Sequence, residues 1–433
     1  MSVRVFGLAA LGALSVLCAA CNDKAGAAGP APASSAARAA SSKAPLVIGI
    51  TADASGQYAS SGDSDKRGVL MAIEEANARG GVLGRPVKWV HLDTETTPAT
   101  GSRVAERLIK RDKVAFIVGG VSSGVANAIS QVAQKYGVIY LNTNSSSATE
   151  AGESCHRVKF VWDANGTNFT LAATKGAIET FGKKWLLLTN DYVWGHDTAR
   201  ATKKVVTQNG GEIIDEILVP QGTRDFSSIL LKVQQRAPHV IAAAVGGDDL
   251  KALRAQVTQL KLADKYAWLN NQQDWPDVYG LPRTGLFGVF GTTWYHGLSL
   301  PGVKELNARY AKANPDAKIK TPGNVFYNGY FATRALLEAV ERVKTTNNHA
   351  VIRELEQLKI PAQERMQHHD AFMNPATHQL QQTIYLATAN LTSHSPDDLF
   401  KILSFTSPSQ VIDEEADAKC KLEPFESTPV YEP

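Results

Sequence analysis

The chain has 433 residues, more than one hydrophobic core usually supports, so we expect two lobes or domains. Its composition is ordinary for a soluble globular protein, with 44% hydrophobic and 20% charged residues. The net charge is only +3 and no basic block stands out, so the charge pattern gives no support to nucleic-acid binding.

The N-terminus has the pattern of an export signal. Arg4 precedes an apolar or small run at residues 5–17, which is too short to span a bilayer as a permanent helix. Residues 17–21 resemble a bacterial lipobox, although Cys18 stands where an aliphatic residue is usual. We therefore expect residues 1–21 to be a signal peptide of the lipoprotein type, lipidated at Cys21, with plain signal cleavage as the alternative.

A tract rich in Ala, Ser, Pro and Gly follows at residues 22–43. Such a composition buries too little apolar surface to offset the entropy of ordering, so we expect a flexible linker. An anchor followed by a tether predicts a protein of the periplasm or cell envelope. Its only expected contact with the membrane is through the lipid anchor.

Two of the four cysteines lie outside the signal segment, namely Cys155 and Cys420. In an oxidising compartment two cysteines favour a single disulfide, and two free buried thiols are the alternative. The two cysteines lie far apart in the sequence and only His156 adjoins one of them, so no spaced set of Cys and His ligands indicates a metal site.

Strands and helices alternate from residue 43 onward. We expect strands at residues 46–51, 87–92, 114–118, 138–141, 185–188, 212–219, 240–245, 266–269, 286–294, 382–387 and 400–403. We expect helices at residues 63–78, 99–110, 125–136, 198–208, 226–236, 250–260, 303–313, 327–343 and 350–358. Two successive βαβ series predict two parallel sheets, each covered by helices. Ligands bind beyond the carboxyl ends of such strands, so the loops at residues 53–62, 119–124, 142–148, 190–197, 246–249 and 270–275 are the candidate ligand loops.

Small polar residues follow two strands of the first series. The segment GGVSSG, with Ser122 and Ser123, opens a helix, and its amides and hydroxyls would suit a ligand carboxylate at the positive end of the helix dipole. A small-residue turn with a serine cap explains the same segment. The segment NTNSSS, with Ser145 and Ser146, offers further hydroxyl and amide groups, or forms a solvated loop. Two polar loops at one sheet edge favour a ligand site.

Aromatic and acidic residues occupy the other candidate ligand loops. Tyr192 and Trp194 follow the first strand of the second series, and Tyr58 lies in the first loop of the chain. They would give a ligand flat walls, while core packing is the competing interpretation. Asp248 follows another strand of the second series and would pair with a ligand amine. Asp249 follows Asp248 directly, and capping of the next helix is the alternative role, favoured for Asp249.

Sequence patterns of catalysis are missing. The chain contains no G-x-S-x-G elbow, no H-E-x-x-H motif and no spaced Cys/His set. The cluster His368, His369 and Asp370 has no third partner nearby and is interpreted as a surface loop. We therefore expect no enzyme activity, no cofactor and no metal.

The order and spacing of these segments resemble the periplasmic leucine/isoleucine/valine-binding protein family of ABC importers, over residues 43–404. The segments that carry the resemblance are VIGITADASGQYASSG, GVLMAIEEANARGGVLGRPV, HLDTET, FIVGGVSSG, VIYLNTNSSS, NDYVWGHDTA, GTRDFSSILLKVQQRAPHVI and AAAVGGDD. The resemblance implies an α/β fold with two Rossmann-like lobes, whose parallel sheets are joined by a three-strand hinge (periplasmic binding protein type I). It places the first lobe at residues 44–163 and 289–378, and the second at 164–288 and 379–433, the last part including a C-terminal tail.

The resemblance also implies roles for the candidate residues. One serine of each polar loop would hold a ligand carboxylate, Ser122 or Ser123 and Ser145 or Ser146. Trp194 would form an aromatic wall from the second lobe, beside Tyr192, and Tyr58 belongs to the first-lobe loop. Family members that bind branched-chain amino acids have an acidic residue near Asn271 and Gln272 and an aromatic one near Asp248. This chain has amides at the first place and an acid at the second, so its ligand lacks an amine or Asp248 binds it.

A subgroup resemblance concerns the tail. The segment around Cys155, followed by FVWDANGTN, and Cys420 near the C-terminus are similar to proteobacterial members with a tail disulfide, which implies a Cys155–Cys420 bridge. Several members of that subgroup are associated with aromatic or other small organic acids. We expect a monomeric extracytoplasmic solute-binding protein that delivers an amino acid or a small carboxylate, aromatic ones included, to ABC permease subunits. A ligand sensor coupled to a signalling receptor and a periplasmic enzyme are the alternatives.

Overall fold

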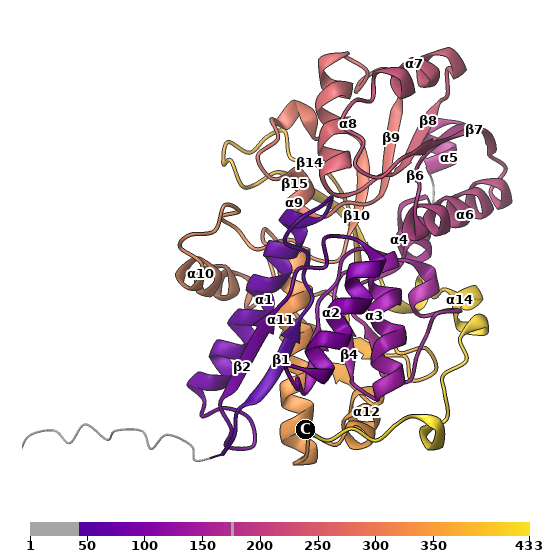
Figure 1. The fold of residues 1–433 in the computed structure, drawn as a ribbon. Coiled ribbons are helices and arrows are strands. Elements are labelled where there is room, and N and C mark those ends of the chain that lie inside the picture. The colour runs from indigo at the N-terminus through magenta and orange to yellow at the C-terminus, as the bar shows by residue number, and fades with distance from the viewer. Residues whose placement is uncertain (1–42, 175–176) are drawn as a thin grey trace, which may run out of the picture. The chain divides into compact units, whose positions relative to one another are not determined.

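The computed structural model describes residues 43–174 and 177–433. The predicted signal peptide, Cys21 and residues 22–42 of the predicted linker lie outside the described residues. Two α/β lobes, each built on a largely parallel sheet, make up the described part (Figure 1). Within these residues no helix has the length and apolar character needed to cross a membrane.

The first lobe contains a parallel five-stranded sheet with the order β2-β1-β3-β4-β5. Its strands are β1 (Leu46–Ile50), β2 (Val87–His91), β3 (Phe116–Val118), β4 (Tyr140–Asn142) and β5 (Lys159–Val161). Its helices are α1 (Ala59–Ala78), α2 (Pro98–Lys110), α3 (Ser123–Tyr136), α10 (Val303–Ala313), α11 (Asn324–Val343) and α12 (Asn348–Glu356). Helix α1 runs beside α11, and Gly68 permits the close approach, because a Cβ there would lie 2.2 Å from the carbonyl oxygen of Phe326.

The second lobe contains a seven-stranded sheet with the order β15-β14-β10-β9-β8-β6-β7. Its parallel strands are β6 (Lys184–Asn190), β7 (Glu212–Val219), β8 (Val240–Ala244), β9 (Ala267–Gln272) and β10 (Val289–Thr292), and β14 (Ile384–Ala389) and β15 (Phe400–Thr406) are antiparallel. Its helices are α4 (Gly166–Thr174), α5 (Ala177–Phe181), α6 (Val193–Gln208), α7 (Ser227–Arg236) and α8 (Gly247–Gln259). Leu186 and Leu188 belong to one apolar cluster, Trp185 and Leu187 to another. Since alternate side chains of β6 point to opposite faces, both faces of this sheet are buried.

The chain passes between the two sheets at three places in the described part. The passages are residues 162–165 after β5, the segment after Thr292, and residues 382–383 before β14. Because β10 pairs with β9 and β14, the second passage lies beyond the lobe boundary expected at residue 288. A small antiparallel sheet, β11 (Lys359–Ile360), β12 (Ala371–Met373) and β13 (Leu380–Gln381), precedes the third passage. Strands of two or three residues are too short to show a period, which explains why the sequence did not predict them.

Two helices of the site begin earlier than their apolar periodicity predicts. Helix α1 begins at Ala59 instead of residue 63, and α6 begins at Val193 instead of residue 198. The added turn of α1 contains only small and polar residues, and that of α6 has two adjacent apolar residues, Val193 and Trp194, without the helical spacing from which the helices were predicted. As a result Trp194 lies in the first turn of α6, where the sequence indicated a loop.

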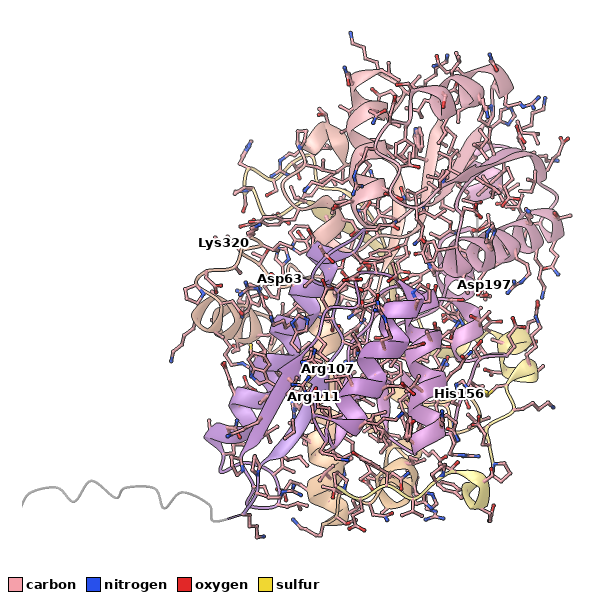
Figure 2. The ribbon with its side chains drawn as sticks, viewed as in Figure 1. Asp63, Arg107, Arg111, His156, Asp197 and Lys320 are labelled. Atoms are coloured by element: carbon pink, nitrogen blue, oxygen red, sulfur yellow. A yellow bond between two sulfur atoms is a disulfide. The ribbon has the colours of Figure 1, made fainter. Side chains whose placement is uncertain are left out.

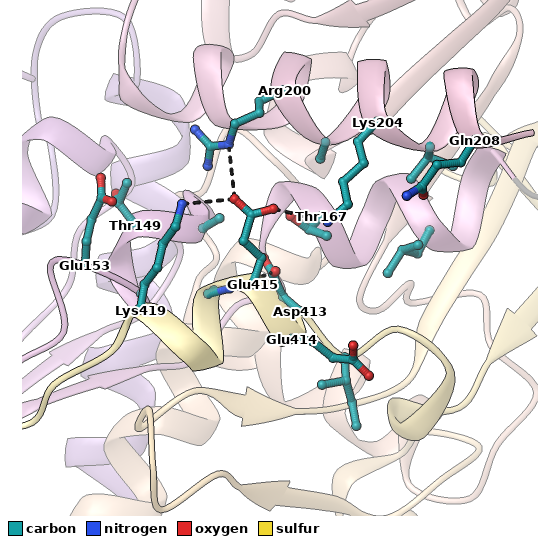
Figure 3. A pocket seen from close by; sticks show the side chains of 17 residues that line it. Thr149, Glu153, Thr167, Arg200, Lys204, Gln208, Asp413, Glu414, Glu415 and Lys419 are labelled. Atoms are coloured by element: carbon teal, nitrogen blue, oxygen red, sulfur yellow. Dashed lines mark hydrogen bonds and ion pairs between the residues drawn. The ribbon is translucent and has the colours of Figure 1, made fainter.

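The C-terminal tail contacts both lobes. After β15 it forms the short helix α14 (Glu414–Lys419), and Cys420 is disulfide-bonded to Cys155 of the first lobe. Figure 3 shows the Glu415 carboxylate between α14 and α6, where Lys204 Nζ lies 3.2 Å from it and Lys419 Nζ 2.9 Å. The disulfide implied by the subgroup resemblance is therefore present in the structure.

Candidate functional site

A small cavity lies between the carboxyl ends of the two parallel sheets. Its lining residues follow strands β1, β3 and β4 of the first sheet and β6, β8 and β9 of the second, as the topology of parallel sheets requires. They are Tyr58, Val121, Asn144, Ser146, Tyr192, Trp194, Gly246, Gln272, Asp274 and Asp277. The free space is about 20 Å³, enough for roughly one water molecule. The lobes are thus closed over the site.

Direct hydrogen bonds join the lobes around this cavity. The hydroxyls of Tyr58 and Tyr192 bond to each other, and Gln57 Nε2 donates to the Gly246 carbonyl at 2.9 Å. Asp197 of α6, labelled in Figure 2, accepts from the Thr149 amide at 3.2 Å and from the Ser147 hydroxyl. The closed arrangement is therefore held by polar contacts between the lobes.

A buried carboxylate holds the first-lobe loops in place. Asp65 of α1 accepts from Thr143 Oγ1 at 2.8 Å, from Asn144 Nδ2 at 3.0 Å and from the Gly120 amide at 3.3 Å. Burial raises the pKa of Asp65 to about 7, and these hydrogen bonds oppose that shift. The loops after β3 and β4 are thus tied to one acid of α1.

Asn190 connects the loops of the second lobe through hydrogen bonds, as Asp65 does in the first lobe. It ends β6, its Oδ1 accepts from the Gly246 amide at 3.1 Å, and its Nδ2 donates to Asp249 at 3.2 Å. The second-lobe loops therefore present Gly246 and its neighbour to the first lobe. A Cβ at Gly247, where φ is +62°, would lie 2.7 Å from the Gln57 carbonyl oxygen, so this close approach needs glycine.

Five of the nine predicted ligand residues line the cavity. They are Tyr58, Ser146, Tyr192, Trp194 and Gln272. The Tyr192 ring lies between the other two aromatics, with its centroid 6.3 Å from that of Tyr58 and 6.0 Å from that of Trp194. Both lobes therefore contribute aromatic walls.

The other four predicted residues do not line the cavity. Ser123 Oγ accepts from the Trp194 amide at 3.1 Å, and Ser145 Oγ donates to Glu150 at 2.9 Å. Ser122 precedes α3 without a side-chain capping bond. Asp248 has a side chain 43% exposed and pairs with Arg224 at 3.2 Å. The position of Asp248 outside the cavity lining therefore gives no support to the hypothesis that it binds a ligand amine.

Two cavity carboxylates were missed by the sequence reasoning. Asp274 and Asp277 lie at the start of α9 (Trp275–Val278), just after β9. Asp274 belongs to the candidate loop at residues 270–275, in which only the amide Gln272 was predicted to bind the ligand. Burial raises the pKa of Asp274, and burial together with the Asp274 carboxylate raises the pKa of Asp277 well above its ordinary value. The acidic signal was present in the sequence, two and five residues after Gln272, in an irregular segment without a period.

A third acid lies behind the cavity at the first passage between the sheets. Asp163 accepts from Ser146 Oγ at 2.7 Å, from Gln272 Nε2 at 2.9 Å and from Asn328 Nδ2 at 3.1 Å. Burial and then the Asp274 carboxylate raise its pKa to about 7. Asp163 thus holds cavity side chains of both lobes at the hinge.

Ser145 and its neighbour Ser146 have opposite environments, which gives a direct prediction. Replacing Ser145 with alanine removes a donor to buried Glu150, so the free energy of unfolding should fall by about 1–3 kcal/mol without loss of ligand affinity. The change Ser146→Ala should instead lower ligand affinity. Urea unfolding and calorimetric titration measure the two effects, and Ser228→Ala on the exposed side of α7 is the control, expected to stay within about 0.5 kcal/mol. An affinity loss in Ser145→Ala would contradict this assignment.

The fold and site define a two-lobed binding protein with a ligand cavity between its lobes. A family model described as periplasmic binding protein matches residues 45–395, so the chain belongs to this family, in its Leu/Ile/Val-binding type. Members of the family are the substrate-binding proteins of transporters rather than enzymes.

Two curated relatives illustrate the sequence similarity. Leu/Ile/Val-binding protein homolog 3 of Brucella melitensis is 25% identical over 316 residues, 71% of this chain and 82% of that protein. Leu/Ile/Val-binding protein BraC3 of Rhizobium johnstonii is 28% identical over 198 residues, 45% of this chain. In that match the chain spans about half, 53%, of the length of BraC3.

Solved structures show the same fold. A periplasmic binding protein from Burkholderia mallei aligns with a TM-score of 0.78 at 24% identity, covering 87% of this chain and 99% of that one. A solute binding protein of an ABC transporter from Rhodopseudomonas palustris BisB5, in complex with 3,4-dihydroxy benzoic acid, has a TM-score of 0.75 at 20% identity, covering 84% and 98%. The architecture is thus the type I periplasmic binding protein fold.

Proposed function

We propose that the chain is an extracytoplasmic solute-binding protein that captures one small organic solute and presents it to the permease of an ABC importer. The observation that carries the proposal is the cavity itself, enclosed by both lobes at the carboxyl ends of two parallel sheets. Such a site is complete only when the lobes are closed, so a bound ligand would favour the closed conformation. A permease could then distinguish the loaded protein from the empty one.

The contacts between the lobes support a clamp mechanism. The ligand would first meet the first-lobe loops around Ser146 and Tyr58, and closure would then bring Tyr192 and Trp194 over it. In the closed state Tyr58 bonds directly to Tyr192, so a bound solute would separate these two rings. The closed surface formed in this way is what a permease would recognise.

The relatives support transport as the context. The names of the curated relatives refer to leucine, isoleucine and valine, and the Rhodopseudomonas palustris structure refers to an aromatic acid. For this chain we propose export, anchoring at Cys21, a periplasmic or envelope location and a monomeric state. The division into two lobes belongs to the same proposal, with boundaries near residues 163 and 378 and the second one at the passage after Thr292.

A thermal-shift screen tests the function. The mature protein is heated with amino acids, amides, amines, dicarboxylates and aromatic acids, and one class should give a saturable rise in Tm, because a ligand that binds only the folded state stabilises it. Trp194→Ala should remove that rise, since truncating a buried aromatic wall costs about 2 kcal/mol or more of binding free energy.

Trp89→Ala is the matched control, because Trp89 on β2 is 45% exposed and far from the cavity lining. Its ligand response should equal that of the wild type. If no class raises Tm, or if the rise survives in Trp194→Ala, the proposed function at this site is wrong.

A further inference from the structure

Three aromatic rings gather on one side of the cavity. Tyr58 comes from the first lobe and Tyr192 and Trp194 from the second, and Tyr58 and Trp194 are only 4% and 5% exposed. The faces of such rings carry partial negative charge and attract cations, most strongly when water is excluded. A partly desolvated cation between these walls would be stabilised by all three.

Two carboxyl groups lie among the other lining residues. Asp277 accepts from the Gly247 amide at 2.8 Å and from Ser61 Oγ at 3.3 Å, and Asp274 accepts from Gln272 and Asn324. All these donors are uncharged. None of the ten described residues that line the cavity is Lys, Arg or His. The cavity therefore offers two carboxyl groups, whose ionised form a bound cation would favour, and no positively charged side chain to a ligand.

Arg254 is a buried cation that interacts electrostatically with Asp277, but its guanidinium bonds to groups outside the cavity. Arg254 of α8 donates to the Asn270 side chain at 2.9 Å and to the carbonyls of Gly285 and Phe287 at 3.1 Å each. It influences Asp277 electrostatically but does not line the cavity. It is therefore not a partner for a ligand carboxylate.

Of the four serines expected to hold a carboxylate, only Ser146 lines the cavity, and its hydroxyl donates to Asp163 at 2.7 Å. Ser145 donates to Glu150, and neither Ser122 nor Ser123 lines the cavity. By contrast, Trp194 Nε1 is buried and has no hydrogen-bond partner among the described residues. One neutral donor is thus free in the cavity wall, which suits a hydroxyl or carbonyl oxygen of a ligand.

We propose, resting on the function proposed above, that the solute is a small organic cation of the alkylammonium or amidinium class, held between the three aromatic rings and the carboxylates of Asp274 and Asp277. A hydroxyl or carbonyl group on the same molecule accepts from Trp194 Nε1. The site thereby disfavours anions, because an anion would enter beside two acids with no compensating cation.

The charge state of the acids makes cation binding depend on pH. The titratable and charged groups that act on Asp277 are Asp274, Asp248, Tyr58, Tyr192 and Arg254. Burial and the Asp274 carboxylate raise the pKa of Asp277 in the empty site, whereas a bound cation favours the ionised carboxylate and thus promotes release of its proton to solvent. Affinity for a cation should therefore rise with increasing pH and fall as pH decreases.

Isosteric probes test the proposal by calorimetric titration of the mature protein. The pairs are choline with 3,3-dimethyl-1-butanol and benzamidine with benzamide, and the anions are 3,3-dimethylbutanoate and benzoate. At least one cation should bind about tenfold or more tightly than its neutral isostere, as a desolvated cation–π site predicts. Neither anion should bind.

Variants of the acids provide the second arm. Asp277→Asn and Asp274→Asn should each lower cation affinity about tenfold or more and leave the neutral isostere unchanged, while Asp248→Asn, outside the cavity, is the control and should keep wild-type affinity. A neutral or anionic probe that binds as tightly as its cationic isostere, or a panel without any bound cation, overturns the cation assignment. If another solute class then raises Tm in the wider screen, the proposed transport function is retained and only the cation assignment is wrong. If no solute class raises Tm, both proposals are wrong.

Discussion

Lys159→Met should lower the free energy of unfolding by about 3–5 kcal/mol, the usual cost of breaking a buried ion pair. Lys159 Nζ lies 2.8 Å from Glu150 Oε2, and the two side chains are 1% and 0% exposed. Burial lowers the pKa of Lys159 and raises that of Glu150, and each partner opposes the shift of the other. Removing the lysine leaves a carboxylate without a charge partner in the first lobe. Urea unfolding followed by circular dichroism measures the loss.

Two controls separate this cause from general damage to the fold. Combining Lys159→Met with Glu150→Leu removes both charges and should recover most of the lost stability, since no unpaired charge remains. Lys110→Met breaks only a surface pair, in which Lys110 is 56% exposed and 3.4 Å from Glu106, and should leave stability close to that of the wild type. A Lys159→Met loss as small as that of Lys110→Met would show that the pair is not important for stability.

Replacing both Cys155 and Cys420 with alanine should lower the free energy of unfolding by about 2–4 kcal/mol. The disulfide joins residues 265 positions apart, so in the unfolded chain it closes a very long loop and removes many conformations. Unfolding in urea with and without a reducing agent measures the same difference in the wild-type chain. The double alanine variant should not respond to the reducing agent.

The tail should remain partly docked without the disulfide. Arg157 donates from its amide to Glu423 at 2.7 Å, and the Tyr431 hydroxyl donates to the Val114 carbonyl at 2.6 Å, so the last residues contact the first lobe independently. Ligand affinity should therefore change little. Equal stability of the reduced and oxidised protein would show that these other contacts already hold the tail.

The lobes and the edge that carries the site were predictable because they depend on local patterns. Alternation of apolar strands with amphipathic helices requires parallel sheets, and parallel sheets place their ligand loops at the carboxyl ends of the strands. Tyr58, Ser146, Tyr192, Trp194 and Gln272 were found by that rule. The short strand β5 escaped it, because Lys159 interrupts its apolar run, whereas β3 and β4 lie in uninterrupted apolar runs.

The direction of each side chain was not predictable in the same way. Ser145 and Ser146 are neighbours in an irregular loop, yet one faces Glu150 and the other the cavity and Asp163. Similarly, Asp248 turns to Arg224 while Asp277, far along the chain, reaches the cavity. No residue pattern distinguishes such pairs, because the partners come from other elements.

The amino-acid sequence alone therefore established the family, the doubled α/β architecture and the strand ends around the cavity, since periodicity and segment order are local properties of the chain. The tertiary structure decided which hydroxyls and carboxylates line the cavity, and it joined Cys155 to Cys420 across 265 positions. It also showed that two acids, Asp274 and Asp277, line the cavity, although the sequence comparison had found only amides, Asn271 and Gln272, in this region. The balance of charge in a binding site is a sum over side chains from distant segments, and only the folded chain brings those segments together.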